Sequence, residues 1–427
     1  MSENDLREIL ECLQIPSEYA HAETAETIAR LNSWKSTSTH LLRDLSRLAK
    51  EKELSVAEQA NVIAAAVSFD GENSWTSPES HALATEILSD FSEPDSSLMF
   101  QLLETDVNPL FRPSLHPSLN PSTGRKLDRP AGGPMGTQDF YETQTWKKYP
   151  AAGNLVSWCL RHIQSQDYDR LWYLVIPPIM TFLDDYQVPY KLEGVRMVEE
   201  LLQHVPREIL KRTGVDGLIL TSLNTCLAQL DDAESPQLIQ TAISASLSLS
   251  LLTTNLGSSA QFDQLCALLG ERIVGTIWLY SYDKPGVVQA SVDSLPPLLS
   301  ALGLGCCRYL KALIPQLLHP LLPVPFTTAP FDLQISSLHV LTVIMNECPC
   351  RMSQWQGTIL DGISRCWVNS TETQLTANHS GVEKLKKHLR SSCEALAKVC
   401  PTIIEGEFRR LLVADYEMFQ DLVAGIA

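Results

Sequence analysis

The sequence predicts an all-α protein, and two observations support this expectation. Apolar residues recur at the spacing of one helix face, i, i+3, i+4 and i+7, in several separate stretches. No run of alternating β-branched residues of the kind that forms strands stands out. The apolar stripes are Leu155, Trp158, Cys159, His162 and Ile163; Val195, Val198, Leu202 and Val205; and Ile335, Leu338, Thr342 and Met345.

A degenerate internal repeat makes the predicted fold more specific. The stretch Leu174–Pro206 contains an apolar helix with an early proline, a turn and a longer amphipathic helix closed by a proline. The same order recurs in Leu313–Pro349, and a third helix pair is expected within Pro285–Leu304. Helix pairs of about 40 residues that cannot bury their apolar faces alone stack on their neighbours. The sequence therefore predicts a HEAT-like α-solenoid.

Three regions follow from the pattern. An N-terminal helical region is expected over residues 1–104, with one helix starting at the Ser55-x-x-Glu58 pattern and another at Ser77, before Pro78. A Pro/Gly-rich ordered crossing segment follows over 105–153, where helical periodicity stops. The HEAT-like helical solenoid is expected over 154–427.

The stretch GRKLDRPAGGPMG, Gly124–Gly136, is the most unusual part of the crossing segment. Between residues 112 and 148 there are six basic and three acidic residues, although the whole chain carries a net charge of −17. Three interpretations remain open: a structural crossing pinned by Arg125 and Arg129 to acidic helix ends, a partner contact, or a small anion site built from backbone N–H groups. The strand–glycine–lysine–helix pattern of a phosphate loop is missing.

Composition limits the function classes. The chain has 427 residues, 33 of them basic and 50 acidic, which argues against general nucleic-acid binding because that needs a broad basic surface. The N-terminus lacks the basic and apolar regions of a secretory signal. We also expect no apolar run as long as a membrane span. We therefore expect an intracellular protein with protein partners, without direct nucleic-acid or membrane binding.

Catalytic and metal-binding patterns are mostly missing from the sequence. It contains no P-loop, H-E-x-x-H or G-x-S-x-G motif. Asp184 and Asp185 could serve acid–base chemistry or Mg²⁺ binding, with His162 completing a hydrolase site, but adjacent carboxylates at a helix end more often cap the turn or bind a partner's cations. We expect no enzyme activity and no cofactor.

The chain has eleven cysteines, an odd number without a C-x-x-C pair. Most lie within apolar helical patterns, so we expect free thiols that pack as small hydrophobic side chains. Cys348 and Cys350, with Cys366 beyond them, form a weaker metal candidate because no histidine lies at a ligand-like spacing.

Two blocks of sequence resemble the Tel-two-interacting protein two family. His116–Ile163 contains "HPSLNPSTGRKLDRPAGG", the "QTWK" of Gln144–Lys147 and the helix "LVSWCLRHI". Leu171–Leu202 contains the sequence of "PPI", "LDDY" and "YKLEG" in that order. The C-terminal half agrees only in helical character.

That resemblance implies an all-helical HEAT-like solenoid without enzyme activity. Members of the family form the third subunit of a trimer with Tel-two and Tel-two-interacting protein one. The trimer is a cochaperone that acts with the heat-shock-90 chaperone and its AAA-ATPase-containing adaptor. Its clients are the phosphatidylinositol-3-kinase-related kinases of TOR signalling, the DNA-damage response and telomere maintenance. Cytoplasmic and nuclear locations are expected.

The candidate residues serve either partner binding or attachment of the crossing segment. The C-terminal solenoid and the edge of the Arg125–Arg129 stretch are the expected contacts with Tel-two-interacting protein one. The aromatic residues of the crossing, Tyr141, Trp146 and Tyr149, would be anchors, unless they pin the segment to its own helices. A rival interpretation is a solenoid adaptor in nuclear transport or trafficking. The candidates are Arg125, Lys126, Arg129, Tyr141, Trp146, Tyr149, Asp184 and Asp185.

Overall fold

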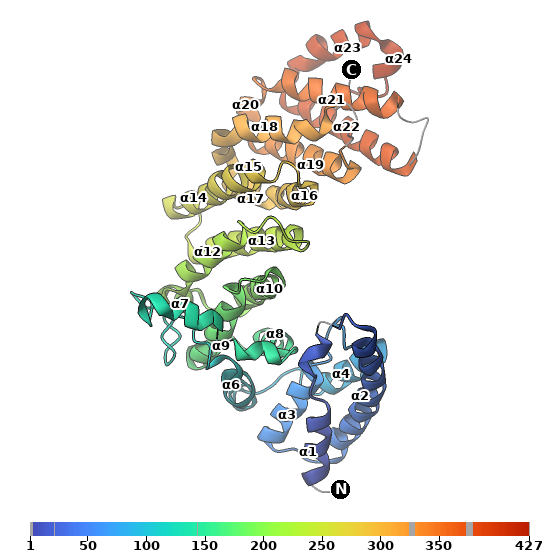
Figure 1. Ribbon diagram of the computed structural model, residues 1–427. Coiled ribbons are helices and arrows are strands. Elements are labelled where there is room, and N and C mark those ends of the chain that lie inside the picture. Colours follow the sequence, from blue (N-terminus) through green and yellow to red (C-terminus); the bar gives the residue numbers. More distant parts are fainter. Residues whose placement is uncertain (1–2, 21, 143, 324–328, 373–378, 427) are drawn as a thin grey trace. The chain divides into compact units, whose positions relative to one another are not determined.

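The computed structural model describes residues 3–20, 22–142, 144–323, 329–372 and 379–426. The chain forms two compact units, unit 1 from Met1 to Leu223 and unit 2 from Asn224 to Ala427. Within the described residues both units are helical, and the only β pairing is an isolated antiparallel bridge between Leu119 and Lys126. The all-α prediction is therefore confirmed (Figure 1).

Unit 1 is built from helices that pack in neighbouring pairs. The helix α2 packs on α4, α3 packs on α5 and α8, and α10 packs on both α8 and α9. The buried side chains of these helices are mostly leucine, isoleucine, valine and the larger aromatic residues. The helices are α1 (Glu3–Cys12), α2 (Ala25–Glu51), α3 (Val56–Val67), α4 (Pro78–Ser89), α5 (Ser96–Leu102), α6 (Asn108–Phe111), α7 (Gly133–Glu142), α8 (Ala152–His162), α9 (Tyr168–Leu183), α10 (Val188–His204), α11 (Arg207–Thr213) and α12 (Val215–Cys226), whose last turn enters unit 2.

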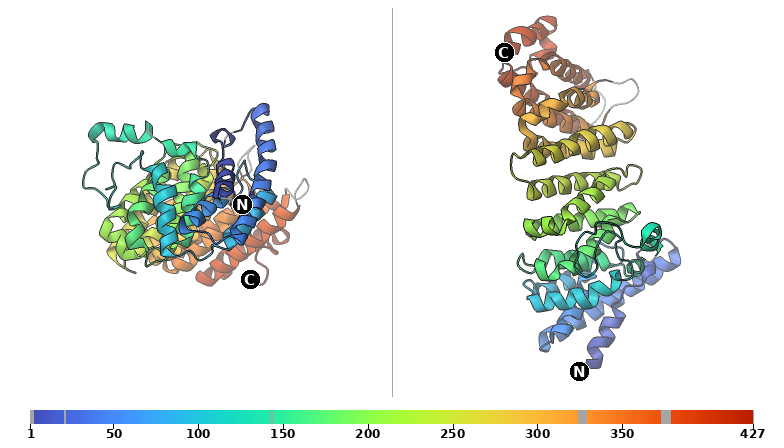
Figure 2. Two further views of the ribbon diagram at one scale, coloured as in Figure 1. Left: turned by 90° about the horizontal axis from the view of Figure 1, so that it is seen from below. Right: turned by 90° about the vertical axis from the view of Figure 1, so that its left-hand side faces the viewer.

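Unit 2 shows the solenoid pattern most clearly. The helices α13, α16, α19 and α22 pack one on the next in chain order, and the right-hand view of Figure 2 shows the helices of this unit in successive layers. The helices are α13 (Ser235–Thr253), α14 (Ser259–Cys266), α15 (Trp278–Tyr280), α16 (Pro285–Asp293), α17 (Leu295–Leu302), α18 (Leu310–Leu318), α19 (Phe331–Glu347), α20 (Pro349–Met352), α21 (Gln356–Glu372), α22 (His379–Val399), α23 (Arg409–Ala414) and α24 (Tyr416–Phe419).

The local signals in the sequence form the expected structures. Ser55 and Glu58 close a capping box at the start of α3, and Pro78 occupies the first turn of α4 after the cap residue Ser77. The repeat units correspond to α9 with α10 and to α18 with α19, and the third predicted pair is α16 with α17. These helix pairs confirm the HEAT-like α-solenoid class.

The predicted crossing segment is more helical than its composition suggested. The helix of α5 continues through a π-helical stretch, η2 (Leu103–Val107), and α6 into residue 111. The chain is then irregular up to α7 (Gly133–Glu142), and a 3₁₀ turn, η3 (Thr145–Lys148), precedes α8. Both predicted boundaries of the crossing, 104/105 and 153/154, lie inside unit 1.

The N-terminal helices pack on the rest of unit 1. The Asn154 side-chain amide donates to the backbone oxygens of Val67 and Asp70, at 3.3 and 2.9 Å. Arg161 forms an ion pair with Asp70 at 3.2 Å. Because these contacts join the end of α3 to α8, residues of the N-terminal region and the following helices share one core.

One stretch of unit 2, Leu295–Leu321, meets the length and composition criteria for a membrane-crossing helix, with a mean hydropathy of 1.3. The expectation that no run approaches this length is therefore wrong. The stretch is divided by Gly303, whose φ of +51° ends α17, and by the 3₁₀ segment η5 (Gly303–Tyr309) with Arg308. Except for the exposed Leu304, its leucines are buried, and α17 and α18 pack against α19 in the core of unit 2.

Helices α9 and α10 approach so closely that only glycine fits at one position. A Cβ atom added to Gly194 would lie 2.4 Å from the backbone nitrogen of Leu183 and 2.6 Å from its Cα. Both atoms belong to the backbone of α9, so a small side-chain movement cannot make room. The Gly194 in the "YKLEG" motif is thus explained by helix packing.

We predict that Gly194→Ala lowers the free energy of unfolding of unit 1 by about 3 kcal/mol, because the methyl group overpacks a backbone contact. Gly217→Ala is the matched control, since Gly217 lies in α12 and a Cβ there would have no neighbour within 4 Å. That variant should gain about 0.5–1 kcal/mol from helix propensity. Urea unfolding measures both, and equal effects of the two substitutions would refute the packing explanation.

Candidate partner-binding surface

The C-terminal turn of α9 holds the crossing segment in place. The ring Nε2–H of His116 donates to Asp184 Oδ2 at 2.9 Å, while His116 Nδ1 accepts from the backbone N–H of Ser118 at 3.2 Å. The hydroxyl of Tyr141, on α7, donates to the backbone oxygen of Asp184 at 3.1 Å. His116 is buried, so Asp184 is the partner of an internal histidine, and its carboxylate fixes the start of the crossing.

Asp185 fixes the other end of the crossing. Its side chain is fully buried and forms an ion pair with Lys147 at 2.8 Å, while its second oxygen accepts from the Gln187 N–H. The Lys147 ammonium lies 4.5 and 4.6 Å from the ring centroids of Tyr186 and Tyr190, so cation–π attraction adds to the ion pair. Of the roles left open for these carboxylates, Asp185 takes that of capping the turn between α9 and α10.

Trp146 is a core residue. It is 1% exposed, and its ring centroid lies 4.3 Å from that of Phe182, 4.9 Å from that of Tyr190 and 5.8 Å from that of Phe111. Of the two roles left open for the aromatic residues, the structure supports attachment of the segment for Trp146. Tyr141 is 39% exposed and also contacts Asp184, so it contributes to attachment while keeping part of its ring on the surface.

Gly124 lets the middle of the crossing lie flat on α9. Its φ is +62°, and a Cβ there would lie 2.9 Å from Trp172 Cδ1 and 3.0 Å from the Trp172 backbone oxygen. The indole N–H of Trp172 donates to the Gly124 oxygen at 3.1 Å. Positive φ and close approach both favour glycine, which explains the glycine in the "STGRKL" motif.

Several backbone N–H groups around Gly124 are already bonded within the protein. Gly124 donates to the Asn120 oxygen at 2.8 Å, Lys126 donates to the Thr213 oxygen at 3.0 Å, and Leu127 donates to the Ser118 oxygen at 2.8 Å. An anion nest needs several free N–H groups that converge on one point. The geometry therefore favours the structural crossing over the small anion site.

The basic side chains of this stretch do not pin it. Arg125, Lys126 and Arg129 are exposed, and no ion pair of theirs is found in the part of the chain that the structure describes. The proposed pinning of Arg125 and Arg129 to acidic helix ends is therefore wrong. The acidic end of α9 is taken by His116 and Lys147, which lie nearer the two ends of the crossing. The three basic side chains remain a charged surface.

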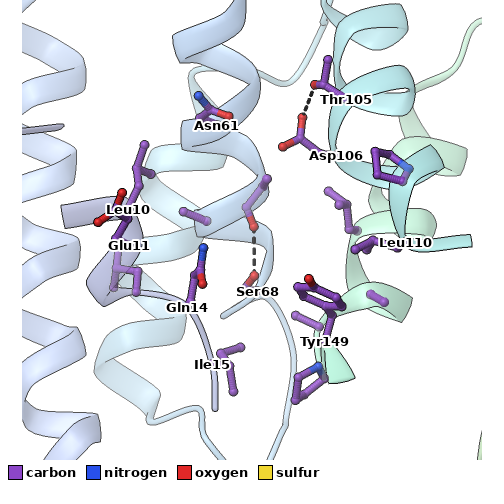
Figure 3. A pocket seen from close by; sticks show the side chains of 18 of the residues that line it. Leu10, Glu11, Gln14, Ile15, Asn61, Ser68, Thr105, Asp106, Leu110 and Tyr149 are labelled. Carbon is purple, nitrogen blue, oxygen red and sulfur yellow. Dashed lines mark hydrogen bonds between the residues drawn. The ribbon is translucent and has the colours of Figure 1, made fainter. Parts of the chain in front are cut away.

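A groove of about 510 Å³ opens where the crossing segment ends. Figure 3 shows Tyr149 and Leu110 on one side of it and Leu10, Gln14 and Ile15 on the other. Tyr149 is 53% exposed, so a large part of its ring is available to a ligand. The floor includes small side chains of α3, among them Ala64 and Ala65. The crossing thus helps to build a groove that combines apolar and polar side chains.

A π-helical turn forms one wall of the groove. Pro109 has no N–H and its ring crowds the carbonyl four residues earlier, which disfavours regular α-helical bonding just before it. The π-helix η2 (Leu103–Val107) lies at this point and carries Asp106 on the groove wall. Burial raises the pKa of Asp106, although the Thr105 hydroxyl donates to its carboxylate at 2.7 Å. The wall thus combines apolar surface with one acidic group.

The remaining candidate chemistry is dispersed. His162 stacks on Trp158 with its ring centroid at 4.1 Å and donates from Nδ1 to the Trp158 oxygen, and burial lowers its pKa. Asp184 is paired with His116, and Asp185 with Lys147. The structure therefore gives each member of the proposed hydrolase site a separate partner.

All eleven cysteines are free, and eight of them are buried. Burial raises the pKa of the Cys366 thiol to about 11, as expected of a thiol that packs as a small hydrophobic group. Among the described residues, no group of three or more cysteine, histidine or acidic side chains could hold a metal ion.

Sequence reasoning missed the roles of His116, Gly124 and Lys147. All three lie inside the motifs that carried the resemblance, so the signal was present. The motifs did not show which side chains meet, because the His116–Asp184 hydrogen bond and the Lys147–Asp185 ion pair join residues separated by 68 and 38 positions in the chain.

The stacked helix pairs and the firmly attached crossing define an α-solenoid protein with an elaborated N-terminal unit. A model of the Tti2 family matches residues 62–329, which include the whole crossing segment. The chain therefore belongs to the Tti2 family.

Curated relatives carry matching names. TELO2-interacting protein 2 of Rattus norvegicus is 28% identical over 137 residues, or 31% of this chain and 23% of that protein. TELO2-interacting protein 2 of Mus musculus is 32% identical over 63 residues, or 15% of this chain and 12% of that protein. The matches thus span less than a quarter of the relatives' length.

Among solved structures, a chain from the complex of Kap95p with RanGDP is similar in fold, with a TM-score of 0.50. The alignment covers 99% of this chain and 52% of that chain, at 12% identity. This likeness concerns the helical-repeat fold alone.

We predict that Lys147→Met lowers the free energy of unfolding by about 3–5 kcal/mol, because it leaves the buried Asp185 carboxylate without its cation. The double variant Lys147→Met/Asp185→Asn should recover much of this loss, since asparagine keeps the oxygen that accepts from the Gln187 N–H. Urea unfolding of the wild type, both single variants and the double variant gives the coupling. Strictly additive losses would show that the pair contributes no interaction of its own.

Proposed function

We propose that this protein is a non-catalytic scaffold subunit of a trimeric cochaperone complex, with Tel-two and Tel-two-interacting protein one as its partners. In this role the complex supports maturation and stability of phosphatidylinositol-3-kinase-related kinases, together with the heat-shock-90 chaperone and its AAA-ATPase adaptor. Family membership is the observation that carries the proposal. The names of the curated relatives also support an interaction with a Tel-two protein.

The groove beside Tyr149 is the contact that we propose for a partner subunit. It presents an exposed aromatic ring above small apolar side chains, and aromatic residues in pockets supply much of the binding energy in protein interfaces. It also lies directly after the motif-bearing crossing, which is held by the His116–Asp184 hydrogen bond and the Lys147–Asp185 ion pair. A rigid wall of this kind lowers the entropy cost of association.

A scaffold role is favoured over catalysis by the use of the acidic residues. Asp184 accepts a hydrogen bond from His116, and Asp185 forms an ion pair with Lys147 and accepts from the Gln187 N–H, so both carboxylates already have partners within the fold. The adaptor alternative in transport or trafficking has less support, because the likeness to Kap95p is one of fold at 12% identity. We propose cytoplasmic and nuclear locations, where the client kinases act.

Capture of the tagged full chain from its native cells, followed by mass spectrometry at moderate salt, tests the proposal. We expect Tel-two and Tel-two-interacting protein one in near-equal amounts. Tyr149→Ala should reduce partner recovery about tenfold, since loss of an aromatic anchor commonly costs 2 kcal/mol or more. Tyr416→Ala is the control, because Tyr416 is also an exposed tyrosine, 62% exposed, but lies on α24 of unit 2.

The two parts of the proposal fail in different ways. If the wild-type chain recovers neither partner, the assembly itself is refuted. If the wild type recovers both and Tyr149→Ala does so equally well, the groove is not the contact. The second result should be checked with Ala65→Trp, which fills the groove floor without removing an existing contact of Tyr149.

A further inference from the structure

Two neighbouring turns of unit 2 form a preordered edge. One turn joins α12 to α13 over residues 227–234, and the other joins α15 to α16 over 281–284. Lys284 Nζ forms an ion pair with Asp231 Oδ1, and a Cβ on Gly286 would lie 3.3 Å from Pro236 Cγ. We call this surface the acidic–aromatic edge; its residues are Asp231, Asp232, Glu234, Tyr280, Tyr282 and Asp283.

Local hydrogen bonds fix both turns. In the first, the Asp232 N–H donates to Ser235 Oγ at 3.0 Å and Asp232 Oδ1 accepts from the Glu234 N–H at 2.9 Å. In the second, the Lys284 N–H donates to the Ser281 oxygen at 2.9 Å. The backbone that carries the charged and aromatic groups is therefore ordered without a ligand.

The edge carries an excess of negative charge. Asp231, Asp232, Glu234 and Asp283 provide four carboxylates against the single ammonium of Lys284, a net charge of −3. All four acidic residues are exposed. Within the described part of the chain, the only ion pair of the edge is that between Lys284 and Asp231.

Two exposed tyrosines lie within three residues of Asp283 in the chain. Tyr280 is 62% exposed and Tyr282 is 86% exposed, and neither phenol bonds to another described residue. The neighbouring Leu279 is 61% exposed. Tyrosine faces attract cations, and tyrosine is enriched at the centres of protein interfaces. Exposed aromatic and aliphatic side chains that lie close together in the chain, here at the end of α15 and in the turn after it, are typical of a binding surface.

We propose that the acidic–aromatic edge binds a lysine- and arginine-rich segment of a partner protein. Arginine fits both features at once, because its planar guanidinium stacks on an aromatic ring while its N–H groups bond a carboxylate in pairs. The inference goes beyond the scaffold role proposed above, because it rests on unit 2 alone and concerns the chemistry of the ligand.

Other occupants fit this edge less well. Nucleic acid and anionic lipid would bring negative charge to a surface of the same sign. A purely apolar helix would cover Tyr280 and Tyr282 but would remove water from the carboxylates without replacing it by hydrogen bonds or cations. The combination of exposed rings and unpaired carboxylates is satisfied by a basic segment.

The test uses the purified full chain and a fluorescein-labelled peptide of alternating arginine and serine, with binding followed by fluorescence anisotropy at physiological salt. Neutralising the edge with Asp232→Asn, Glu234→Gln and Asp283→Asn should weaken binding about tenfold or more. Asparagine at position 232 retains the oxygen that caps the turn. The double variant Tyr280→Ala/Tyr282→Ala, which keeps the charge, should weaken binding several-fold through lost cation–π contacts.

A charge-matched control separates the edge from general attraction to an acidic protein. Glu405→Gln, Glu417→Gln and Asp421→Asn make the same change in net charge at exposed positions near the C-terminus of unit 2. We expect this control to change affinity less than twofold. Equal weakening by control and edge variants, or unchanged binding after loss of both tyrosines, would overturn the proposal. Neither result bears on the trimer, which is tested separately by capture from cells.

Discussion

The close contact between α9 and α10 is the constraint on which the rest of unit 1 depends. Gly194 brings the backbone of α10 against Leu183, so the last turn of α9 ends at a fixed place. Three residues at the end of α9 and in the turn after it serve the crossing segment: Phe182 packs on Trp146, Asp184 accepts from His116, and Asp185 pairs with Lys147. A shift of α9 along α10 would disturb all of these contacts together, because they lie within four positions of one another in the chain.

The helices were predictable because their signals are local. The capping box at Ser55 and the apolar stripe on α8 require only the geometry of a few neighbouring residues. The solenoid class was also predictable, since helix pairs with one apolar face each must stack to bury it. The π-helical start of the crossing at η2 was not foreseen, because helix continuation before Pro109 depends on packing against α9 and α8, which the sequence pattern does not contain.

The crossing was predicted to be attached by Arg125 and Arg129, but other residues attach it. Arg125 and Arg129 attract attention in an acidic chain, yet surface ion pairs of flexible side chains contribute little to stability. The structure instead uses His116 and Lys147, whose partners Asp184 and Asp185 lie at one helix end. These carboxylates replace much of the hydration that the two side chains lose on burial. For Lys147, two tyrosine rings supply part of that replacement. Burial, which sequence spacing does not reveal, decides which charged groups hold the fold.

The two candidate surfaces differ in the physics of the partner they fit. The groove beside Tyr149 combines apolar side chains with two basic and two acidic residues, Arg7, Lys148, Glu11 and Asp106, so burial of surface contributes to association there and the local charges balance. The acidic–aromatic edge of unit 2 has a net charge of −3 within two short turns, so it attracts a basic segment from a distance and loses that attraction as salt screens it. Burial of surface in a groove favours a lasting contact between subunits, whereas a charged rim mainly accelerates encounter and selects the partner's charge. The chain thus offers one surface suited to stable assembly and one suited to exchange of a basic ligand.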